Sequence, residues 1–118
     1  GTTAGDVQSD RIAAAKTLQQ QYGGVIVLKG PGTIIASSGN LRICKEGNPG
    51  MATGGMGDVL TGIITGLVAQ GHSLADAATV GVCLHARAGD LSAKADGERG
   101  MMATDLLPFV RELVNPEQ

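Results

Sequence analysis

The sequence predicts an α/β fold in which helices pack on a small sheet, and three observations support this class. Residues 25–28 form a short apolar run bounded by glycines, which is typical of a buried parallel strand. Residues 33–36 and 41–44 flank a Ser-Ser-Gly-Asn turn, which is the pattern of a β-hairpin. Helical spacing of apolar residues precedes and follows these segments. A strand and a hairpin make a poor sheet by themselves, so we expect residues 1–118 to be the C-terminal part of a larger α/β domain.

The first helix is expected over residues 7–22, where apolar side chains recur at spacings of three and four. Asp6 or Ser9 is a suitable cap for its N-terminus, because both residue types accept hydrogen bonds from the first free N–H groups. Gly23 is a suitable stop, because glycine tolerates the left-handed conformation that commonly ends a helix.

Three further helices are predicted in the second half of the chain. The helix over residues 58–69 contains Gly62 and Gly66, and each interior glycine costs about 1 kcal/mol relative to alanine. We therefore attribute these glycines to close packing against another helix. Ser73 is a suitable cap for the next helix, and the last helix is expected over residues 104–114.

Composition limits the classes of function. A chain of 118 residues with 42% hydrophobic residues suits one globular domain at most. Its net charge is −2 and its few basic residues are scattered, so nothing indicates a nucleic-acid partner. No segment is long enough for a membrane span, and no signal-peptide pattern is present. We therefore expect a cytoplasmic protein with no membrane partner.

Histidine and cysteine give weak signals. Cys44 and Cys83 are far apart, and lone cysteines in aliphatic surroundings are usually small buried residues. His72 follows a glycine that ends a helix and is expected to be exposed, whereas His85 in an Ala-rich helix is expected in the core. None of these residues has the spacing of metal ligands.

A glycine-rich loop is the main candidate for chemistry. Gly54-Gly55-Met56-Gly57-Asp58 stands directly before an apolar helical segment. A helix N-terminus presents unpaired N–H groups and a partial positive charge, and glycines let that backbone approach an anion closely. The spacing matches neither the Walker pattern nor the dinucleotide-binding GxGxxG pattern. The loop therefore predicts a nucleotide-phosphate site of another kind.

Asp58 has two interpretations, which the pattern alone leaves open. A carboxylate repels a bound phosphate, so its presence makes sense if it takes a proton from a hydroxyl group that attacks a phosphoryl group. The alternative is that Asp58 caps the helix, which aspartate does well.

A second candidate segment is Lys29-Gly30-Pro31-Gly32-Thr33, directly after the predicted strand. A lysine at the carboxyl end of a parallel strand points into the crevice where α/β sheets bind ligands. The alternative is an ordinary charged turn, for which glycine and proline are the usual residues.

Three segments together resemble the C-terminal signature of the ADP-dependent NAD(P)H-hydrate dehydratases, a family of the ribokinase-like superfamily. They are Lys-Gly-Pro-Gly-Thr at 29–33, Asn-Pro-Gly-Met-Ala-Thr-Gly-Gly-Met-Gly-Asp-Val-Leu at 48–60 and Arg-Gly-Met-Met-Ala-Thr-Asp-Leu at 99–106. The segment at 48–60 is very specific, whereas the first segment alone is not. The resemblance covers nearly the whole chain and implies a three-layer α/β/α ribokinase-like fold, of which residues 1–118 form the C-terminal portion.

The resemblance implies a repair enzyme. Its substrate is NADH or NADPH that has added water across a double bond of the nicotinamide ring. The enzyme removes this water while ADP is converted to AMP and phosphate, and Mg²⁺ is expected to accompany the nucleotide.

Site residues follow from the same resemblance. Asp58 contacts the hydrate and acts as base on its hydroxyl group. An anion hole is formed by the backbone N–H groups of Gly55, Met56 and Gly57. The nucleotide contacts Lys29, Gly30, Pro31, Gly32, Thr33 and Gly57.

The family's domain is longer than residues 1–118, so we expect this chain to pair with an N-terminal half of the domain and to form a homo-oligomer. Two alternatives remain at this point. One is a small-molecule kinase of the same superfamily, acting on a sugar or on hydroxyethylthiazole, because the glycine loop and Asp58 would serve both reactions. The other is a fragment that binds the nucleotide without turnover.

Overall fold

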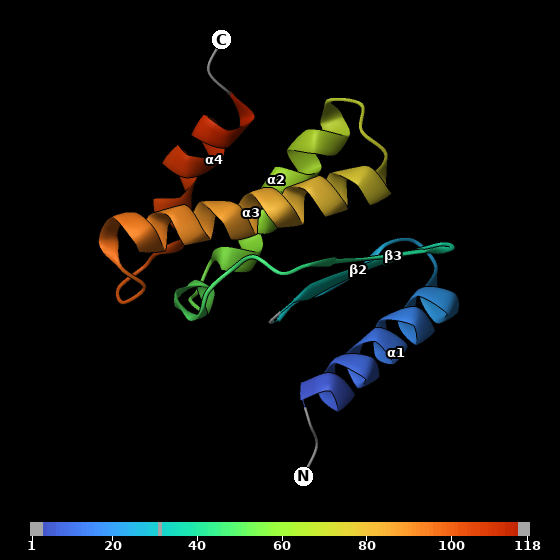
Figure 1. Ribbon diagram of the computed structural model, residues 1–118. Helices are drawn as coiled ribbons and strands as arrows, with labels where there is room; N and C mark the ends of the chain where they lie inside the picture. The colour runs from blue at the N-terminus through green and yellow to red at the C-terminus, as the bar shows by residue number, and fades with distance from the viewer. Residues whose placement is uncertain (1–3, 31, 116–118) are drawn as a thin grey trace. The chain divides into compact units, whose positions relative to one another are not determined.

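A computed structural model describes residues 4–30 and 32–115 (Figure 1). The chain divides into two compact units, Gly1–Lys45 and Glu46–Gln118, and each unit is described by itself. Within the described residues, the first unit holds one helix and three strands. The second holds three α-helices and two short 3-10 helices.

Helix α1 (Ala4–Tyr22) opens the first unit. It begins at Ala4 and not at residue 7, so the two proposed caps, Asp6 and Ser9, lie inside the helix, and that prediction is wrong. The predicted stop is confirmed. Gly23 has φ +71°, and its N–H donates to the carbonyl of Gln19 over 2.7 Å, which is the left-handed ending that favours glycine.

The sheet has the order β1-β2-β3, and both pairs of strands are antiparallel. The strands are β1 (Ile26–Leu28), β2 (Thr33–Ser37) and β3 (Asn40–Cys44). The predicted hairpin is confirmed, with Ser37 opposite Asn40 and Gly39 in the turn at φ +71°. The central strand β2 is the most buried of the three, as its Ile34, Ile35 and Ala36 show.

The prediction that β1 is a buried parallel strand is wrong for the described residues. β1 is half-buried and runs antiparallel to β2, with Val27 opposite Ile35. A parallel neighbour requires a long crossover connection, whereas a few residues join β1 to β2. A short connection allows only the antiparallel arrangement, and the second edge of β1 has no strand partner among the described residues.

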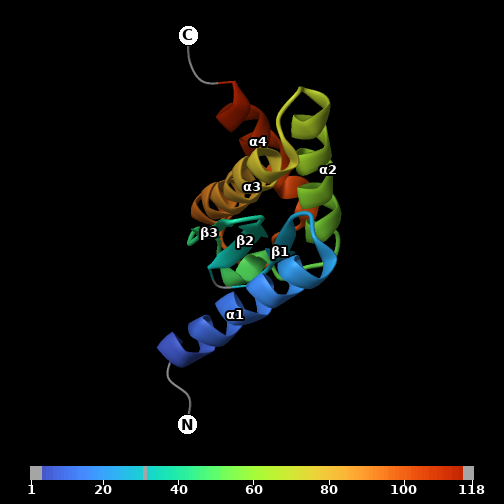
Figure 2. The same ribbon diagram turned by 90° about the vertical axis from the view of Figure 1, so that its right-hand side faces the viewer.

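α1 packs against β1 and β2, and Figure 2 shows the helix next to these strands. Ala15 on the helix and Ile34 on the sheet are both fully buried at this contact. The small alanine side chain lets the helix approach the sheet closely, which suits a chain with one Tyr, one Phe and no Trp.

The second unit is helical. Its long helix α3 (Leu74–Asp96) packs against α2 (Met56–Ala69) and against α4 (Leu107–Val114) (Figure 1). Ser73 caps α3 as predicted, since its side chain accepts a hydrogen bond from the N–H of Asp76 over 3.2 Å. The predicted last helix begins as a 3-10 turn, η2 (Ala103–Leu106), before α4 continues it. Among the described residues, no helix combines the length and the apolar character needed to cross a membrane.

Glycine serves close helix packing, but not at the predicted positions. Gly62 and Gly66 are exposed, and a side chain at either would meet no atom within 4 Å. The close approach is made instead by Gly81 on α3, where an added Cβ would lie 2.7 Å from Cγ1 of Ile64 on α2. The attribution of Gly62 and Gly66 to helix packing is therefore wrong within the described residues.

We expect Gly81→Ala and Gly62→Ala to change the free energy of unfolding in opposite directions. Gly62→Ala stabilises α2 by about 1 kcal/mol, because alanine favours the helix and meets open space. Gly81→Ala destabilises by about 1 kcal/mol or more, because overpacking at Ile64 exceeds the gain in helix propensity. Urea unfolding followed by circular dichroism measures both. A loss of stability in Gly62→Ala would mean that this face of α2 is covered in solution.

Candidate functional site

The glycine loop reaches α2 through a left-handed residue. Gly55 is the N-cap of α2 with φ +86° and ψ −10°, a conformation that glycine adopts without strain. A Cβ at this position would also come within 3.3 Å of the Cβ of Ala103. The chain therefore turns sharply into the helix at Gly55 while resting against η2.

Met56 fixes the start of α2. Its side chain is 2% exposed and packs with Ala88 of α3, Met101 and Leu106. Burying a methionine side chain contributes about 1.5–3 kcal/mol. The helix therefore begins at a residue that is anchored in the core of the second unit.

The backbone around Met56 is open to solvent. Gly54, Gly55, Gly57 and Asp58 are all exposed, and Gly55 provides no side-chain cap. The first N–H groups of a helix have no intrahelical acceptor. The N–H of Met56 donates to the carbonyl of Thr53 over 3.4 Å, whereas those of Gly57 and Asp58 make no hydrogen bond with the described residues and are available to an anion. This geometry suits the proposed phosphate site.

Asp58 lies in the first turn of α2 and is exposed. It does not act as the N-cap, because Gly55 occupies that position. Its carboxylate makes no hydrogen bond or ion pair with the described residues, although it benefits from the positive end of the helix. Of the two interpretations of Asp58, the capping role is therefore wrong, and the carboxylate is free to contact a ligand.

The segment 98–105 packs against the glycine loop and the start of α2, a contact that the sequence did not indicate. Met101 is 6% exposed in the same core cluster as Met56. The carboxylate of Asp105 accepts a hydrogen bond from the N–H of Met102 over 2.8 Å, which holds the start of η2. The position of Ala103 against Gly55 is fixed in this way.

The first unit contains the Lys29–Thr33 turn between β1 and β2. Lys29 is exposed, Pro31 lies outside the described residues, and Gly32 has φ +69°. The hydroxyl group of Thr33 donates to the carbonyl of Gly30 over 3.2 Å. Because β1 is antiparallel to β2, the predicted crevice at a parallel strand end is not formed by these residues.

Arg11 organises this turn, and sequence reasoning missed it. Its guanidinium group donates from Nη1 to the carbonyl of Gly32 over 3.2 Å and from Nη2 to the carbonyl of Leu28 over 3.3 Å. A Cβ on Gly30 would lie 2.8 Å from Nη2, so the turn has room for Arg11 only because that residue is glycine. A contact between a helix and a turn more than fifteen residues away leaves no local sequence pattern.

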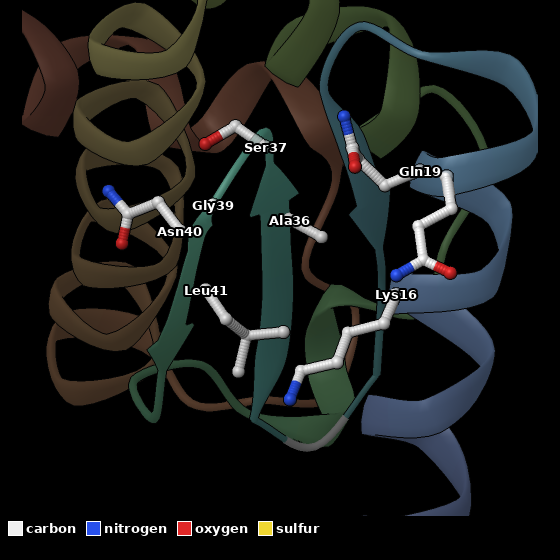
Figure 3. Close-up of a pocket in the computed structure, with 8 residues that line it drawn as sticks. Lys16, Gln19, Ala36, Ser37, Gly39, Asn40 and Leu41 are labelled. Carbon is white, nitrogen blue, oxygen red and sulfur yellow. The ribbon is translucent and has the colours of Figure 1, made fainter.

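One cavity of about 340 Å³ lies elsewhere in the first unit. In Figure 3, Lys16 extends from α1 across the sheet toward Leu41. The cavity also involves Ser37 and Gly39, at the end of β2 opposite the Lys29–Thr33 turn. It therefore contains none of the predicted site residues.

The remaining histidines and cysteines take structural positions. His72 is exposed and His85 is buried at 5%, as predicted. Cys44 is buried as expected, Cys83 is half-buried, and neither forms a disulfide bond among the described residues. No group of three or more His, Cys, Asp or Glu side chains in residues 4–30 and 32–115 is placed to hold a metal ion.

We expect Gly55→Ala to destabilise the second unit by about 1–2 kcal/mol, because alanine is strained in the left-handed region. Gly54→Ala is the matched control, since its added Cβ meets no atom within 4 Å and its φ is not positive. The control is expected to stay within about 0.5 kcal/mol of the parent chain in urea unfolding. Equal losses in the two variants would contradict a left-handed start of α2.

Relatives of known function share nearly the whole of this chain. A bifunctional NAD(P)H-hydrate repair enzyme from Vibrio cholerae is 56% identical over 115 residues, which are 98% of this chain and 23% of that protein. The chain therefore spans about a quarter of the length of this bifunctional relative.

Solved structures show the same arrangement of the backbone. An ADP/ATP-dependent NAD(P)H-hydrate dehydratase from Bacillus subtilis, co-crystallised with ATP and Mg²⁺ and soaked with CoA, superposes with a TM-score of 0.83 at 31% identity. The match covers 91% of this chain and 40% of that one. A ribokinase-like superfamily protein from Enterococcus faecalis gives a TM-score of 0.74 at 33% identity, over 89% of this chain and 37% of that one. The predicted α/β, ribokinase-like fold class is therefore confirmed.

The sequence model of the NAD(P)H-hydrate dehydratase family matches residues 2–111, which is almost the full length of the chain. This agrees with the glycine loop, the free carboxylate of Asp58 and the fold of the solved neighbours. The chain belongs to the NAD(P)H-hydrate dehydratase family.

Proposed function

We propose that the chain provides the phosphate-binding and proton-accepting part of an ADP-dependent NAD(P)H-hydrate dehydratase. The observation that carries this proposal is the start of α2, where exposed backbone N–H groups stand beside the unpaired carboxylate of Asp58. The substrates are ADP and the hydrate of NADH or NADPH. The relatives are longer than this chain, so the activity is proposed for the domain that contains it.

Backbone N–H groups of Gly55, Met56 and Gly57 would stabilise the negative charge that develops during phosphoryl transfer. Asp58 would take the proton from the hydroxyl group of the hydrate. The oxygen of that hydroxyl group would then attack the terminal phosphorus of ADP. AMP leaves, and the hydrate becomes a phosphate ester.

The second step restores the ring. Phosphate is a better leaving group than hydroxide, and the lone pair of the ring nitrogen helps to expel it. The neighbouring ring carbon then loses a proton, and the double bond forms again. The overall products are NAD(P)H, AMP and phosphate.

The turn at Lys29, Gly30, Pro31, Gly32 and Thr33 would contact the nucleotide, with Lys29 offering an ammonium group. Mg²⁺ usually binds through substrate phosphates and one or two carboxylates. The described residues contain no cluster of three ligands, so they fit a metal ion that arrives with the nucleotide and is held mainly by its phosphate oxygens.

A further partner of the chain would be the N-terminal half of its domain. The open edge of β1 offers unpaired backbone groups to a strand from that half, or to a second copy of the chain. We expect the chain alone to self-associate at high concentration in light scattering. A chain that stays monomeric would count against this use of the β1 edge.

We expect Asp58→Asn to lower the rate at which NADH is recovered from its hydrate by a factor of about 10²–10⁴, because the base is removed while the loop backbone is kept. Absorbance of the reduced nicotinamide ring follows the reaction in the presence of ADP and Mg²⁺. The assay is made on the chain alone and on the chain joined to the N-terminal part of its domain.

The matched control is Asp76→Asn, because Asp76 occupies the same position in the first turn of α3 and is also exposed. It should retain the parent rate. If the joined domain recovers no NADH and instead forms a stable phosphate ester of a sugar or thiazole alcohol, the chain belongs to a kinase. Full activity of Asp58→Asn would remove Asp58 from the chemistry.

A further inference from the structure

A carboxylate on α3 holds the loop that leads into the glycine site. Oδ2 of Asp90 accepts a hydrogen bond from the N–H of Gly47, and its Oδ1 accepts one from Nδ2 of Asn48, both over 3.0 Å. Oδ1 of Asn48 in turn accepts from the N–H of Gly50 over 3.0 Å. Two hydrogen bonds thus connect α3 to the loop, and a third continues within the loop from Asn48 to Gly50.

The loop that contains Gly50 and Met51 is packed closely against Glu98 and Gly89. A Cβ on Gly50 would lie 2.6 Å from the carbonyl oxygen of Glu98. A side chain at Gly89, next to Asp90 on α3, would overlap the sulfur of Met51. The loop therefore sits in a slot between α3 and the residues that follow it, and it is fixed there by both packing and hydrogen bonds.

A short path joins this slot to the start of α2. Asn48 caps the 3-10 helix η1 (Pro49–Met51), and the N–H of Ala52 donates to the carbonyl of Pro49 over 3.1 Å. Only four residues, 52–55, lie between η1 and α2. A shift of η1 would therefore move Gly55 and the first N–H groups of α2.

We propose that Asp90 is a positioning residue for the glycine loop, acting through Gly47 and Asn48. It touches neither the loop glycines nor Asp58, so its effect is on their placement. This inference rests on the proposed use of the loop for phosphoryl transfer. Misplacing catalytic groups by a fraction of an ångström lowers the rate steeply, even when the fold is kept.

The hydrogen bond between Asp90 and Asn48 can be tested by swapping the two residue types. Asp90→Asn keeps the shape of the side chain but leaves one of the two donors, Gly47 or Asn48, without an acceptor. Asn48→Asp places two carboxylates face to face. The double variant restores every bond: the new amide at position 90 accepts from Gly47 and donates to the new carboxylate at position 48, which still accepts from Gly50.

Two measurements distinguish a positioning role of Asp90 from a general loss of stability. They also distinguish a failure of this proposal from a failure of the proposed function. Amide hydrogen exchange of Met51, Ala52 and Met56, whose N–H groups donate hydrogen bonds, needs no assumption about the reaction and is measured on the chain without nucleotide. Turnover in the joined domain, divided into kcat and KM for ADP, reports the chemistry. Asp76→Asn on the same helix is the control, and thermal unfolding of each variant shows that it is folded.

Each single variant is expected to accelerate exchange at Met51, Ala52 and Met56 and to lower kcat by about ten- to hundredfold, and the double variant is expected to recover both. Single variants that behave like Asp76→Asn would overturn the proposal. So would a double variant as impaired as the singles, since the charge of Asp90 would then matter and not its hydrogen bonds. If the domain proves to be a kinase, exchange at Met51, Ala52 and Met56 still decides the role of Asp90.

Discussion

The buried side chain of Met56 is the contact on which the candidate site depends. Its burial against Ala88, Met101 and Leu106 fixes the first turn of α2, while the residues on either side of it stay exposed. A loop of glycines has high conformational entropy, and an anion hole needs its N–H groups in fixed directions. One anchored residue within the loop resolves this conflict, because the backbone is held by a side chain that points away from the ligand.

The core of the second unit combines Leu60, Val82 and Leu106 with methionine, alanine and glycine, and the small residues among them let the segments approach one another closely. Glycine at 81 and 89 of α3 accommodates Ile64 and Met51, and methionine adapts its shape to the irregular space that remains. The chain has no Trp, one Tyr and one Phe, so few large side chains are available to fill the space between packed helices. Close backbone approach replaces bulk, and the same property lets the 98–105 segment rest directly against the glycine loop.

Local signals in the sequence predicted local structure well. Gly23 and Ser73 end and begin helices as expected, and the hairpin lies where the turn residues indicate. The direction of β1 was not predictable, because strand direction depends on which partner strand is present. Arg11 and Asp90 were also missed, because each bonds to residues far away in the sequence. The glycine loop was found from its pattern, but the supports behind it are tertiary contacts without a pattern.

The helices of the second unit begin in two ways, and the difference explains why one of them is suited to binding. Ser73 caps α3 with its own side chain and so satisfies a backbone donor that would otherwise be free. Gly55 has no side chain with which to cap α2, so the N–H groups of Gly57 and Asp58 have no side-chain acceptor, while the N–H of Met56 donates to the carbonyl of Thr53. Both helices carry an aspartate in the first turn, so the charge alone does not distinguish them. At α2, exposed backbone donors without a side-chain cap stand beside a carboxylate that makes no hydrogen bond with the described residues, and this combination suits the binding of a phosphate and the acceptance of a proton in one place.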